Sequence, residues 1–386
     1  MLTMRQRKAL TKEVFERYKR SSKREKSKIL NEFVSNTKYN RSYARRLFVS
    51  KNTKLKIHKG VLKRKNYQGR KRIYDRDFFF ALRKVWLAAD QICGQRLKPF
   101  IPELSKILEE KHELKISKTI RKKLTNVGSA TIDRILSREK KKYELKGRST
   151  TKPGTLLKHS IPIRTFEDWD DKRVGFEEAD LVAFCGDSVR GEYINGLNLI
   201  DVATYWVSLE AFIGKAQIRV HAALDKIKKR LPFPILGFDS DNGGEFINGL
   251  MKRYCDFNKI TFTRIRPYKK NDNCFVEQKN YTVLRRFVGY KRYETEKQLK
   301  IIQEMLKLVE AYVNFFQPSM KLIEKHRNGA KVKKKYDKAK TPYKRLKESG
   351  VLKPEKEKDL DRIYRSLNPM DLRRQILKLQ TKLLKT

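Results

Sequence analysis

Cysteine and histidine are scarce in this sequence of 386 residues, which holds four of the first and five of the second. Cys93, Cys185, Cys255 and Cys274 form no CxxC pair, so the ligand spacing of a structural zinc site is missing. We therefore expect no zinc. We expect four reduced cysteines in the core of an intracellular protein, because free cysteine packs as a small hydrophobic residue.

Long apolar runs are also missing. No stretch approaches the roughly 20 consecutive apolar residues that a membrane-spanning helix needs. Met1 to Leu10 lacks the apolar core of a signal peptide. These absences exclude an integral membrane protein and predict that no membrane is a partner.

Acidic residues are few relative to basic ones, with 44 Asp and Glu against 93 Lys and Arg, which leaves a formal net charge of +49. Solubility requires far less, so the charge predicts a polyanionic partner, DNA or RNA. A hydrophobic fraction of 39%, with 20 Phe and 17 Tyr, excludes a wholly disordered chain. The length exceeds that of one hydrophobic core, so we expect several folded domains.

The positive charge is unevenly distributed along the chain. The formal net charge is +29 over residues 1–179, +6 over 180–316 and +14 over 317–386. Basic flanks around a nearly balanced middle are typical of nucleic-acid-binding arms around a catalytic core.

Two stretches are expected to be linkers. The 42 residues between Glu32 and Asp75 contain 14 Lys and Arg and no acid. Residues 51–74 are therefore predicted to be a basic linker that lies along phosphates, with a merely solvated linker as the alternative. Residues 146–173 begin with a stretch rich in Lys and Arg that contains proline and glycine, which predicts an extended basic linker.

Residues 1–50 contain the first of two candidate helix-turn-helix units. Ser22 and Glu25 have the spacing of a capping box that starts one helix, and Asn40 caps the next. In this second helix the residues expected to pack inward are Ala44, Leu47 and Phe48, and those expected to contact DNA are Arg41, Arg45 and Arg46.

Residues 75–145 contain the second candidate unit. Ser129 is expected to cap a helix whose inward face carries Ile132, Ile135 and Leu136. The side chains of this helix expected to contact DNA are Arg134 and Arg138. Basic helical pairs also occur in bundles that bind nothing. Two such units in series on a strongly basic segment favour the DNA-binding interpretation.

Residues 174–316 are predicted to form an α/β domain with a mixed five-stranded sheet. Apolar and β-branched residues predict, in order, strands at 176–187, 193–204 and 205–213, a helix at 215–231, a strand at 235–238, a helix at 244–258 and a strand at 260–267. This order, followed by helices, is shared by the ribonuclease-H-like fold, although many α/β domains come close.

Three carboxylates lie on separate elements of this predicted domain. Asp180 lies within the first strand between apolar residues, where an aspartate without a role destabilises the fold. Asp241 ends the fourth strand in the turn sequence "SDNGGEF", and Glu277 lies on a basic helix. Acidic oxygens converging from separate elements are what a polynucleotidyl transferase with two divalent ions needs.

A spacing of 35 residues separates Asp241 from Glu277. With "SDNGGEF" and "RPYKKNDNCFVEQKN", the sequence resembles, over nearly its whole length, the bacterial insertion-sequence (DDE) transposases with a retroviral-integrase-type catalytic core. The resemblance implies that Asp180, Asp241 and Glu277 are the catalytic residues. It also implies that they bind two Mg2+ or Mn2+ ions.

The resemblance further implies a DNA transposase that binds the ends of an insertion sequence and catalyses metal-dependent cleavage and strand transfer by transesterification. It implies a homo-oligomer on DNA and a prokaryotic cytoplasmic location, at the nucleoid when DNA is bound. The zinc module of the retroviral integrases is absent, so the helix-turn-helix units are expected to recognise the ends. The alternatives are a catalytically inactive DNA-binding regulator and a ribonuclease-H-like nuclease that does not join strands.

Other charged residues near the site have expected roles. Basic residues expected at DNA are Lys269, Lys270, Lys279, Arg285 and Arg286, with a mobile solvated loop as the alternative for the first two. Strand alternation places Glu177 on the face opposite Asp180, and Asp239 is interpreted as structural. Asp201 is either a minor fourth carboxylate or a turn residue, and Glu245 is a candidate helix cap.

Residues 317–386 are predicted to be a basic DNA-binding and assembly region. Near the end, Leu372, Ile376, Leu379 and Leu383 have the spacing of one helical stripe. This stripe predicts either an assembly helix or, more simply, a helix packed on its own domain, because it is short for a coiled coil.

Overall fold

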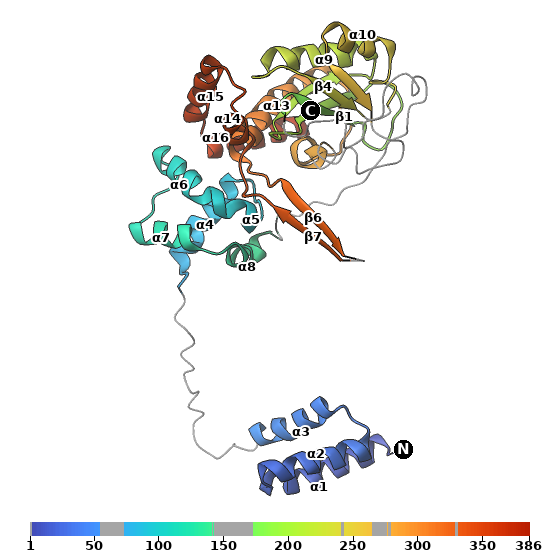
Figure 1. Cartoon of the computed structure of the whole chain (residues 1–386), viewed down its shortest axis with the longest axis vertical. Helices are drawn as coiled ribbons and strands as arrows, with labels where there is room; N and C mark the ends of the chain where they lie inside the picture. The colour runs from blue at the N-terminus through green and yellow to red at the C-terminus, as the bar shows by residue number, and fades with distance from the viewer. Residues whose placement is uncertain are drawn as a thin grey trace. The chain divides into compact units, whose positions relative to one another are not determined.

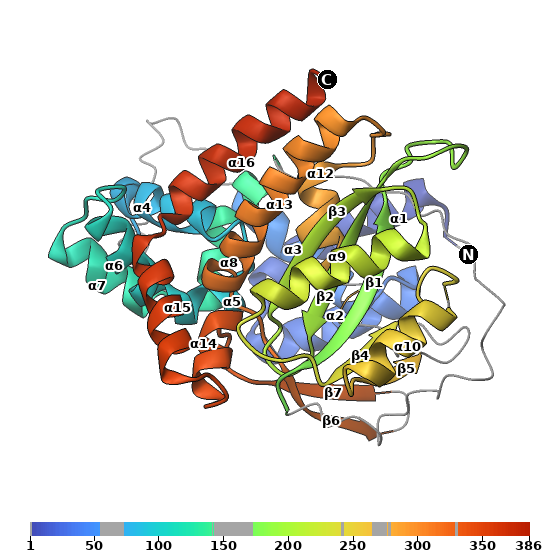
Figure 2. The ribbon, with the colours of Figure 1, turned by 90° about the horizontal axis from the view of Figure 1, so that it is seen from above.

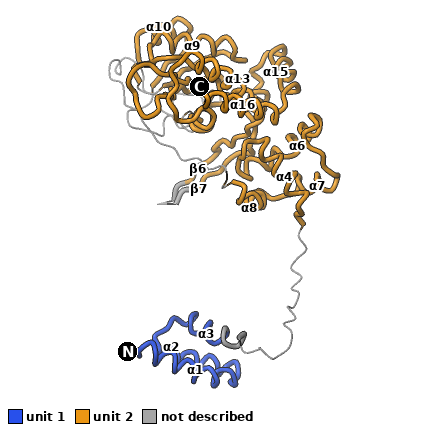
Figure 3. Tube along the Cα trace, turned by 180° about the vertical axis from the view of Figure 1, so that it is seen from behind, with its two compact units in different colours: residues 1–72 blue, residues 73–386 orange. Residues whose placement is uncertain are grey.

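The structure is a computed structural model in which the chain divides into two compact units, residues 1–72 and 73–386 (Figure 3). It describes residues 2–54, 73–140, 142, 173–240, 243–264, 276, 279–328 and 331–386. Most of the two expected linkers, residues 55–72 and 146–172, therefore lies outside the described residues.

The first unit consists, in its described residues, of helices α1 (Met4–Arg20), α2 (Lys23–Thr37) and α3 (Arg41–Lys54). The predicted capping box is present, because the Ser22 N–H donates to Glu25 Oε2 at 2.9 Å and Ser22 Oγ accepts from the Glu25 N–H. Asn40 Oδ1 accepts from the Ser42 N–H at 2.9 Å where α3 begins. The buried core comprises Phe15, Leu30, Phe33, Ala44 and Phe48. Leu47 is partly buried.

The second unit begins with a helical region. Its elements are α4 (Arg76–Ala88), α5 (Gly94–Leu97), the 3-10 turn η1 (Lys98–Phe100), α6 (Ile101–Glu110), α7 (Lys118–Asn126) and α8 (Ser129–Lys140). Helix α8 is present, but Ser129 is its first residue rather than the predicted cap. Ile132 and Leu136 are fully buried and Ile135 is partly buried, so the predicted inward face of this helix is confirmed.

The C-terminal end of α4 is fastened to helix α13 (Glu296–Phe316). The Tyr312 hydroxyl donates to the Ala88 carbonyl oxygen at 2.7 Å. The Gln317 side-chain amide, just after α13, donates to the Ala89 carbonyl oxygen at 2.9 Å. These bonds satisfy carbonyl groups that a helix end leaves without intrahelical donors. The helical region and the α/β region that follows it are therefore joined within one compact unit.

The centre of the second unit is a mixed five-stranded sheet (Figure 2). Its strands are β1 (Phe176–Ala183), β2 (Ile194–Asp201), β3 (Val207–Ile213), β4 (Gly237–Ser240) and β5 (Thr261–Arg264), in the spatial order β3-β2-β1-β4-β5. Strand β1 is antiparallel to β2 and parallel to β4. The first turn between β1 and β2 has positive φ at Gly186 and Gly191, where glycine costs least.

Helices flank the sheet: α9 (Gln217–Arg230), α10 (Gly249–Phe257), the π-helical turn η4 (Asn280–Arg285), α12 (Arg286–Val288) and α13. Helices α9 and α13 both pack on β3. The predicted fold class is confirmed: an N-terminal helical region, a central mixed five-stranded sheet and a helical C-terminus.

Several predicted boundaries were wrong. The first strand ends at Ala183 rather than residue 187, and the second is Ile194–Asp201 rather than 193–204. The fourth strand is Gly237–Ser240 rather than 235–238, because its parallel pairing with β1 runs from Phe176–Gly237 to Ala179–Ser240. Helix α10 begins at Gly249 rather than residue 244. Its cap is Asn248, whose Oδ1 accepts from the Met251 N–H at 2.8 Å, so Glu245 is not the cap.

The C-terminal region contains an antiparallel hairpin of β6 (Leu322–Asn328) and β7 (Lys331–Tyr336), followed by α14 (Pro342–Glu348), α15 (Pro354–Ser366) and α16 (Pro369–Leu384). The hairpin was not predicted. The stripe of Leu372, Ile376, Leu379 and Leu383 is buried, and α16 packs on α13. The simpler prediction for this helix, packing on its own chain, is confirmed.

The cysteines are only partly as expected. Cys185 and Cys255 are buried, as predicted, but Cys93 is exposed because it lies just before the short helix α5. Cys274 lies outside the described residues. In the part of the chain that the structure describes, no helix combines the length and apolar character needed to cross a membrane.

Candidate active site and nucleic-acid surfaces

One face of the central sheet carries three carboxylates on adjacent strands. Glu178 and Asp180 lie two residues apart in β1, so their side chains share a face. Asp239 of β4 is the register partner of Glu178 and joins them there. Glu178 and Asp239 are fully buried, whereas Asp180 is partly exposed. Of the three, Asp180 is thus the carboxylate that a ligand can reach most readily.

Asn280 orients the Asp180 carboxylate directly, and Asn198 does so through its bond to Asn280. The Asn280 side-chain amide donates to Asp180 Oδ2, and the Leu181 N–H donates to Oδ1 at 2.8 Å. Asn198, the register partner of Asp180 on β2, donates in turn to Asn280 Oδ1 at 2.8 Å. This chain of bonds restricts the rotation of the carboxylate. Sequence reasoning missed Asn198 and Asn280, because they contact Asp180 only through the tertiary fold.

Asp241, Glu277, Lys269 and Lys270 lie outside the described residues, so their positions stay predictions. The described residues next to Asp241 and Glu277, however, contact strand β1, which carries Glu178 and Asp180.

Ser240, the residue before Asp241, is the register partner of Ala179 in β1. Val276, the residue before Glu277, is buried, and its N–H donates to Glu178 Oε2 at 3.2 Å. Asn280, three residues after Glu277, holds Asp180. The segments that carry the two other predicted acids thus converge on β1.

Glu178 was also missed as a site residue. Its alternation with Asp180 was readable in the sequence, but its bond to Val276 was not. Asp239 accepts from the Thr263 hydroxyl of β5 at 2.6 Å, which agrees with its interpretation as structural.

The case for metal binding on the Asp180 face of the sheet depends on the chemical type of its donor atoms. Partly exposed carboxylate oxygens such as those of Asp180 are the hard ligands that Mg2+ and Mn2+ take, so the donor type fits. Among the described residues no three His, Cys, Asp or Glu side chains are grouped closely enough to hold an ion. Two of the three predicted ligands are not among those residues.

The opposite face of β1 carries a second, sealed pair of carboxylates. Glu177 lies opposite Asp201 in the β1–β2 register, and both are buried. Asp201 accepts from the Gly175 N–H at 2.7 Å and from the Thr204 N–H and hydroxyl at 2.7 and 2.6 Å. Its role as a turn residue is thereby confirmed, and so is the placement of Glu177 away from Asp180.

Burial changes the acidity of this sealed pair. Burial, followed by the neighbouring Asp201 carboxylate, raises the pKa of Glu177 well above its usual value. Burial also raises the pKa of Asp201, against the hydrogen bonds that it accepts. The neutral acid is favoured on this face, which is unsuited to binding a cation.

The basic residues near the site have different environments. Burial, followed by the charge of Arg96, lowers the pKa of Lys279 to about 7. The Arg285 guanidinium lies over the rings of Phe184 and Tyr290, at 5.6 and 4.9 Å from their centroids. Both basic side chains are partly buried.

Arg286 is engaged within the protein. Its guanidinium donates to Asp90 Oδ1 at 2.9 Å and to Gln91 Oε1 at 3.0 Å, which links the core to the helical region. Asp90 also accepts from Arg373 at 3.0 Å. The bonds of Arg286 all come from Nη2, so its other nitrogens keep donors for a phosphate, and its contact with DNA stays a prediction.

The arginines of the two helix-turn-helix candidates are available to solvent. Those on α3 are Arg41, Arg45 and Arg46, and those on α8 are Arg134 and Arg138; all five are exposed. Their contact with DNA stays a prediction.

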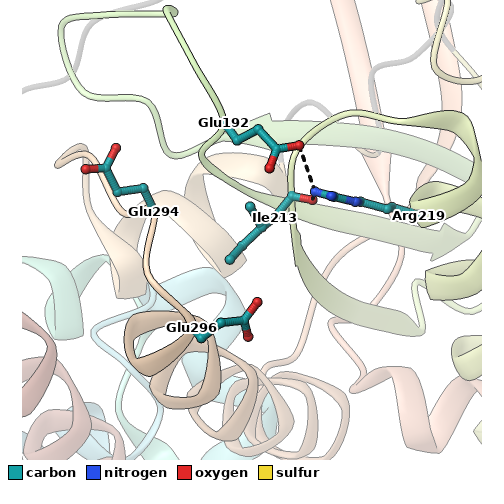
Figure 4. A pocket seen from close by; sticks show the side chains of 5 residues that line it. All are labelled: Glu192, Ile213, Arg219, Glu294 and Glu296. Carbon is teal, nitrogen blue, oxygen red and sulfur yellow. Dashed lines mark hydrogen bonds and ion pairs between the residues drawn. The ribbon is translucent and has the colours of Figure 1, made fainter.

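A cavity of 520 Å3 lies at the edge of the sheet and is lined by Glu192, Ile213, Arg219, Glu294 and Glu296 (Figure 4). Glu192 accepts from Arg219 at 3.0 Å. Three carboxylates in the lining repel phosphate, and Asp180 is not part of it. This cavity is therefore unsuited to nucleic acid.

Comparisons with known proteins give one relative of similar length. The chain matches no protein-family model. Among solved structures it is similar to the catalytic core domain of BIV integrase, with 16% identity and a TM-score of 0.31 over 45% of this chain and 95% of that one. It is also similar to the HTLV-2 integrase catalytic core domain in complex with magnesium, with 13% identity and a TM-score of 0.29 over 37% and 88%.

The curated relative is "Uncharacterized protein y4rM" of Sinorhizobium fredii (strain NBRC 101917 / NGR234). The two sequences are 35% identical over 335 residues, which cover 87% of this chain and 93% of the relative. Identity at this level over nearly both lengths means that this chain belongs to the same family as the y4rM protein.

Proposed function

We propose that this protein is a DNA transposase that cleaves and joins DNA strands at a site formed by Asp180, Asp241 and Glu277. The observation that carries the proposal is the contact of three described neighbours with β1. Ser240 pairs with β1 just before Asp241, and Val276 and Asn280, on either side of Glu277, bond to acidic side chains of β1. Together with the resemblance of the sequence around these acids, the contacts favour one shared site.

The three carboxylates would hold two Mg2+ or Mn2+ ions, which when bound activate the attacking oxygen and stabilise the leaving oxygen. Water attacks a phosphodiester at the end of the element; a new P–O bond forms, and the bond to the 3′ oxygen breaks. The freed 3′ hydroxyl then attacks a phosphodiester of the target and displaces its 3′ oxygen. Cleavage replaces a P–O ester bond by a P–OH bond, and joining replaces one P–O ester bond by another, so neither step requires ATP.

The chain's own residues prepare this chemistry. Asn280 holds Asp180 Oδ2, so that the carboxylate is oriented before DNA arrives. Arg285, at the end of η4, would supply positive charge for the scissile strand, as would the protonated form of Lys279. The exposed arginines of α3 and α8 would bind the ends of the element.

The domain boundaries are part of the proposal: DNA-binding units at 1–50 and 75–145, a catalytic domain at 174–316, and a DNA-binding and assembly region at 317–386. A homo-oligomer would bridge the two element ends.

The test uses full-length protein and a labelled duplex built from the DNA that flanks this gene, with Mg2+ or Mn2+. Asp180→Asn is compared with Asp187→Asn, the same chemical change at an exposed residue in the loop after β1. We expect cleaved and joined products with the wild type and Asp187→Asn and none with Asp180→Asn. Sequence-selective binding without any product would instead identify a regulator, and cleavage without joining would identify a nuclease.

A further inference from the structure

The hairpin of β6 and β7, here called the ribbon (residues 322–328 and 331–336), extends outward from the second unit (Figure 1). Large side chains at its base are exposed, including Ile323 at 62%, Leu322 at 45% and Tyr336 at 45%. A two-stranded hairpin by itself is only marginally stable in water. The stability of the ribbon therefore depends on the contacts at its base and on any partner that binds along its strands.

The base of the ribbon is clamped on both strands. Asp337 Oδ1 accepts from the Lys321 N–H at 2.6 Å, and Asp337 Oδ2 accepts from Arg345 at 2.6 Å. Below them, the backbones of Ser319 and Lys340 exchange two hydrogen bonds of 2.9 and 3.1 Å. The direction of the ribbon is thus set by the fold before any partner binds, which reduces the entropic cost of binding.

The base is also fastened to the central sheet. Lys321 Nζ donates to the Ala203 carbonyl oxygen at 2.9 Å, in the turn between β2 and β3. Lys321 and Arg345 both lie over the Tyr205 ring of that turn, at 5.4 and 5.7 Å from its centroid. The base of the ribbon therefore keeps a fixed position relative to the sheet.

The charge of the ribbon is almost all of one sign. Its basic residues are Lys325, Arg327, Lys331, Lys333, Lys334 and Lys335. Glu324 is its one acid, and it lies 3.9 Å from Lys335 and 2.6 Å from His326. The side chains of Lys333, Lys334 and Lys335 are all exposed.

Strand alternation distributes these lysines over both faces. Lys333 and Lys335 point to one face of β7 and Lys334 to the other. A face that carries lysines cannot pack against a hydrophobic core, so neither face of the ribbon is expected to pack on a second sheet. A polyanion that meets both faces at once is the partner that this charge distribution fits.

We propose that the ribbon enters a groove of duplex DNA and contacts phosphates on both groove walls without reading the sequence. The major groove, about 12 Å wide, admits a two-stranded ribbon, and both of its walls carry phosphates. The exposed Lys333, Lys334 and Lys335 carry point charges that position a protein on the backbone, whereas base recognition uses bidentate side chains such as asparagine or arginine. The inference of contact without sequence reading therefore concerns these three lysines and not Arg327 or Asn328 of β6.

The inference rests on the proposed function, because DNA is the substrate only if that function holds. The inference adds a second kind of DNA contact to the proposed function. The helices α3 and α8 would select the ends of the element, and the ribbon would hold DNA whose sequence is not selected, which is what target DNA requires.

The test compares two triple variants of full-length protein with the same change in charge. One is Lys333→Gln/Lys334→Gln/Lys335→Gln in the ribbon. The matched control is Lys297→Gln/Lys300→Gln/Lys307→Gln, three exposed lysines of α13 that lie outside the proposed DNA-binding regions. Affinity for duplexes of random and element-end sequence is measured by fluorescence anisotropy as a function of KCl concentration.

We expect the ribbon variant to weaken binding by the same factor for both sequences. The slope of log affinity against log salt should fall by about 0.9 for each phosphate that the variant no longer neutralises, relative to wild type and control. The charge-preserving variant Lys333→Arg/Lys334→Arg/Lys335→Arg should bind as the wild type does.

Equal slopes for the ribbon variant and the control would overturn the inference. So would a loss confined to the element-end duplex, or a change in oligomeric state, measured by light scattering, with DNA affinity unchanged. The last result would assign the ribbon to an interface with a second copy of the chain. If the wild type and the control failed to bind DNA at all, the proposed function would fail as well; if the wild type cut and joined DNA while the slopes were equal, only the ribbon inference would fail.

Discussion

The two faces of strand β1 each carry carboxylates, and they differ in what surrounds them. On one face Asp180 is partly exposed and is oriented by amide groups. On the other face Glu177 is buried beside Asp201, and both of its oxygens lack a hydrogen-bond partner within the described residues. The comparison shows that burial and hydrogen bonding, more than residue type, decide which acid is available for chemistry.

The largest expected effect on activity comes from the face of β1 that carries Asp180. Asp180→Asn should lower strand cleavage and joining by about three orders of magnitude or more, because one ligand loses its charge. Binding of duplex DNA and the thermal unfolding midpoint without metal should be unchanged. Unfolding measured with added Mn2+ provides the second readout: the metal should stabilise the wild type and not the variant. An Asp180→Asn variant that still cleaves and joins DNA would contradict the assignment of the catalytic site to the Asp180 face.

A smaller effect is expected from the group that orients Asp180. Asn280→Ala removes the donor to Asp180 and should reduce activity by about 10- to 100-fold, with a higher metal concentration needed for half-maximal rate. The metal titration separates this role from a merely structural one. Asn195→Ala is a control on β2, because Asn195 bonds to the Tyr193 and Gly214 carbonyl oxygens instead. Equal losses in both variants would contradict the positioning role.

The sealed face should affect stability and not activity. Glu177→Met replaces a buried acid, whose oxygens have no partner among the described residues, by an apolar side chain. The change should raise the free energy of unfolding at pH 8 by about 1–3 kcal/mol. Cleavage and joining should stay at the wild-type rate. Chemical denaturation measures the first, and the strand-transfer assay measures the second. A loss of activity with unchanged stability would show that Glu177 has a role in catalysis.

The pH dependence of stability sharpens the same contrast. The pKa values of Glu177 and Asp201 are higher in the folded than in the unfolded state, so the folded protein binds more protons. Their contribution to stability is complete below the usual values near 4 and is lost as pH rises through the folded values. Denaturation from pH 5 to pH 8 should show a smaller decline for Glu177→Met than for the wild type.

The smallest effect concerns the turn that closes the sealed face. Thr204→Val removes the hydroxyl that donates to Asp201 at 2.6 Å and should cost about 1 kcal/mol of stability. Activity should not change. Thr261→Val, at an exposed threonine of β5, is the control for the substitution itself. A stability loss no larger than that of the control would show that the turn does not depend on this bond.

Local patterns predicted much of this structure. The capping box at Ser22, the buried stripe of α16 and the position of Asp180 inside a strand all follow from short spacings in the sequence. Such features depend on hydrogen bonds and packing within one or two helical turns, or on alternation along one strand. They are visible without knowledge of distant contacts.

Long-range contacts explain what was missed. Asn280 lies 100 residues from Asp180, and nothing in either local sequence indicates their bond. The bounds of β4 follow from its parallel pairing with β1, a distant segment of the chain. The ribbon was overlooked because its strands lack apolar alternation; backbone pairing holds them together, and a clamp from Asp337 and Arg345 holds their base.

The most direct test of the account makes the same chemical change on the two faces of β1. Full-length wild type, Asp180→Asn and Glu177→Gln are assayed together for Mg2+- or Mn2+-dependent cleavage and joining of the flanking-DNA duplex. The account predicts that Asp180→Asn forms no product and that Glu177→Gln forms as much as the wild type. Equal activity of the two variants, whether retained or abolished, would contradict the assignment of the catalytic site to the Asp180 face.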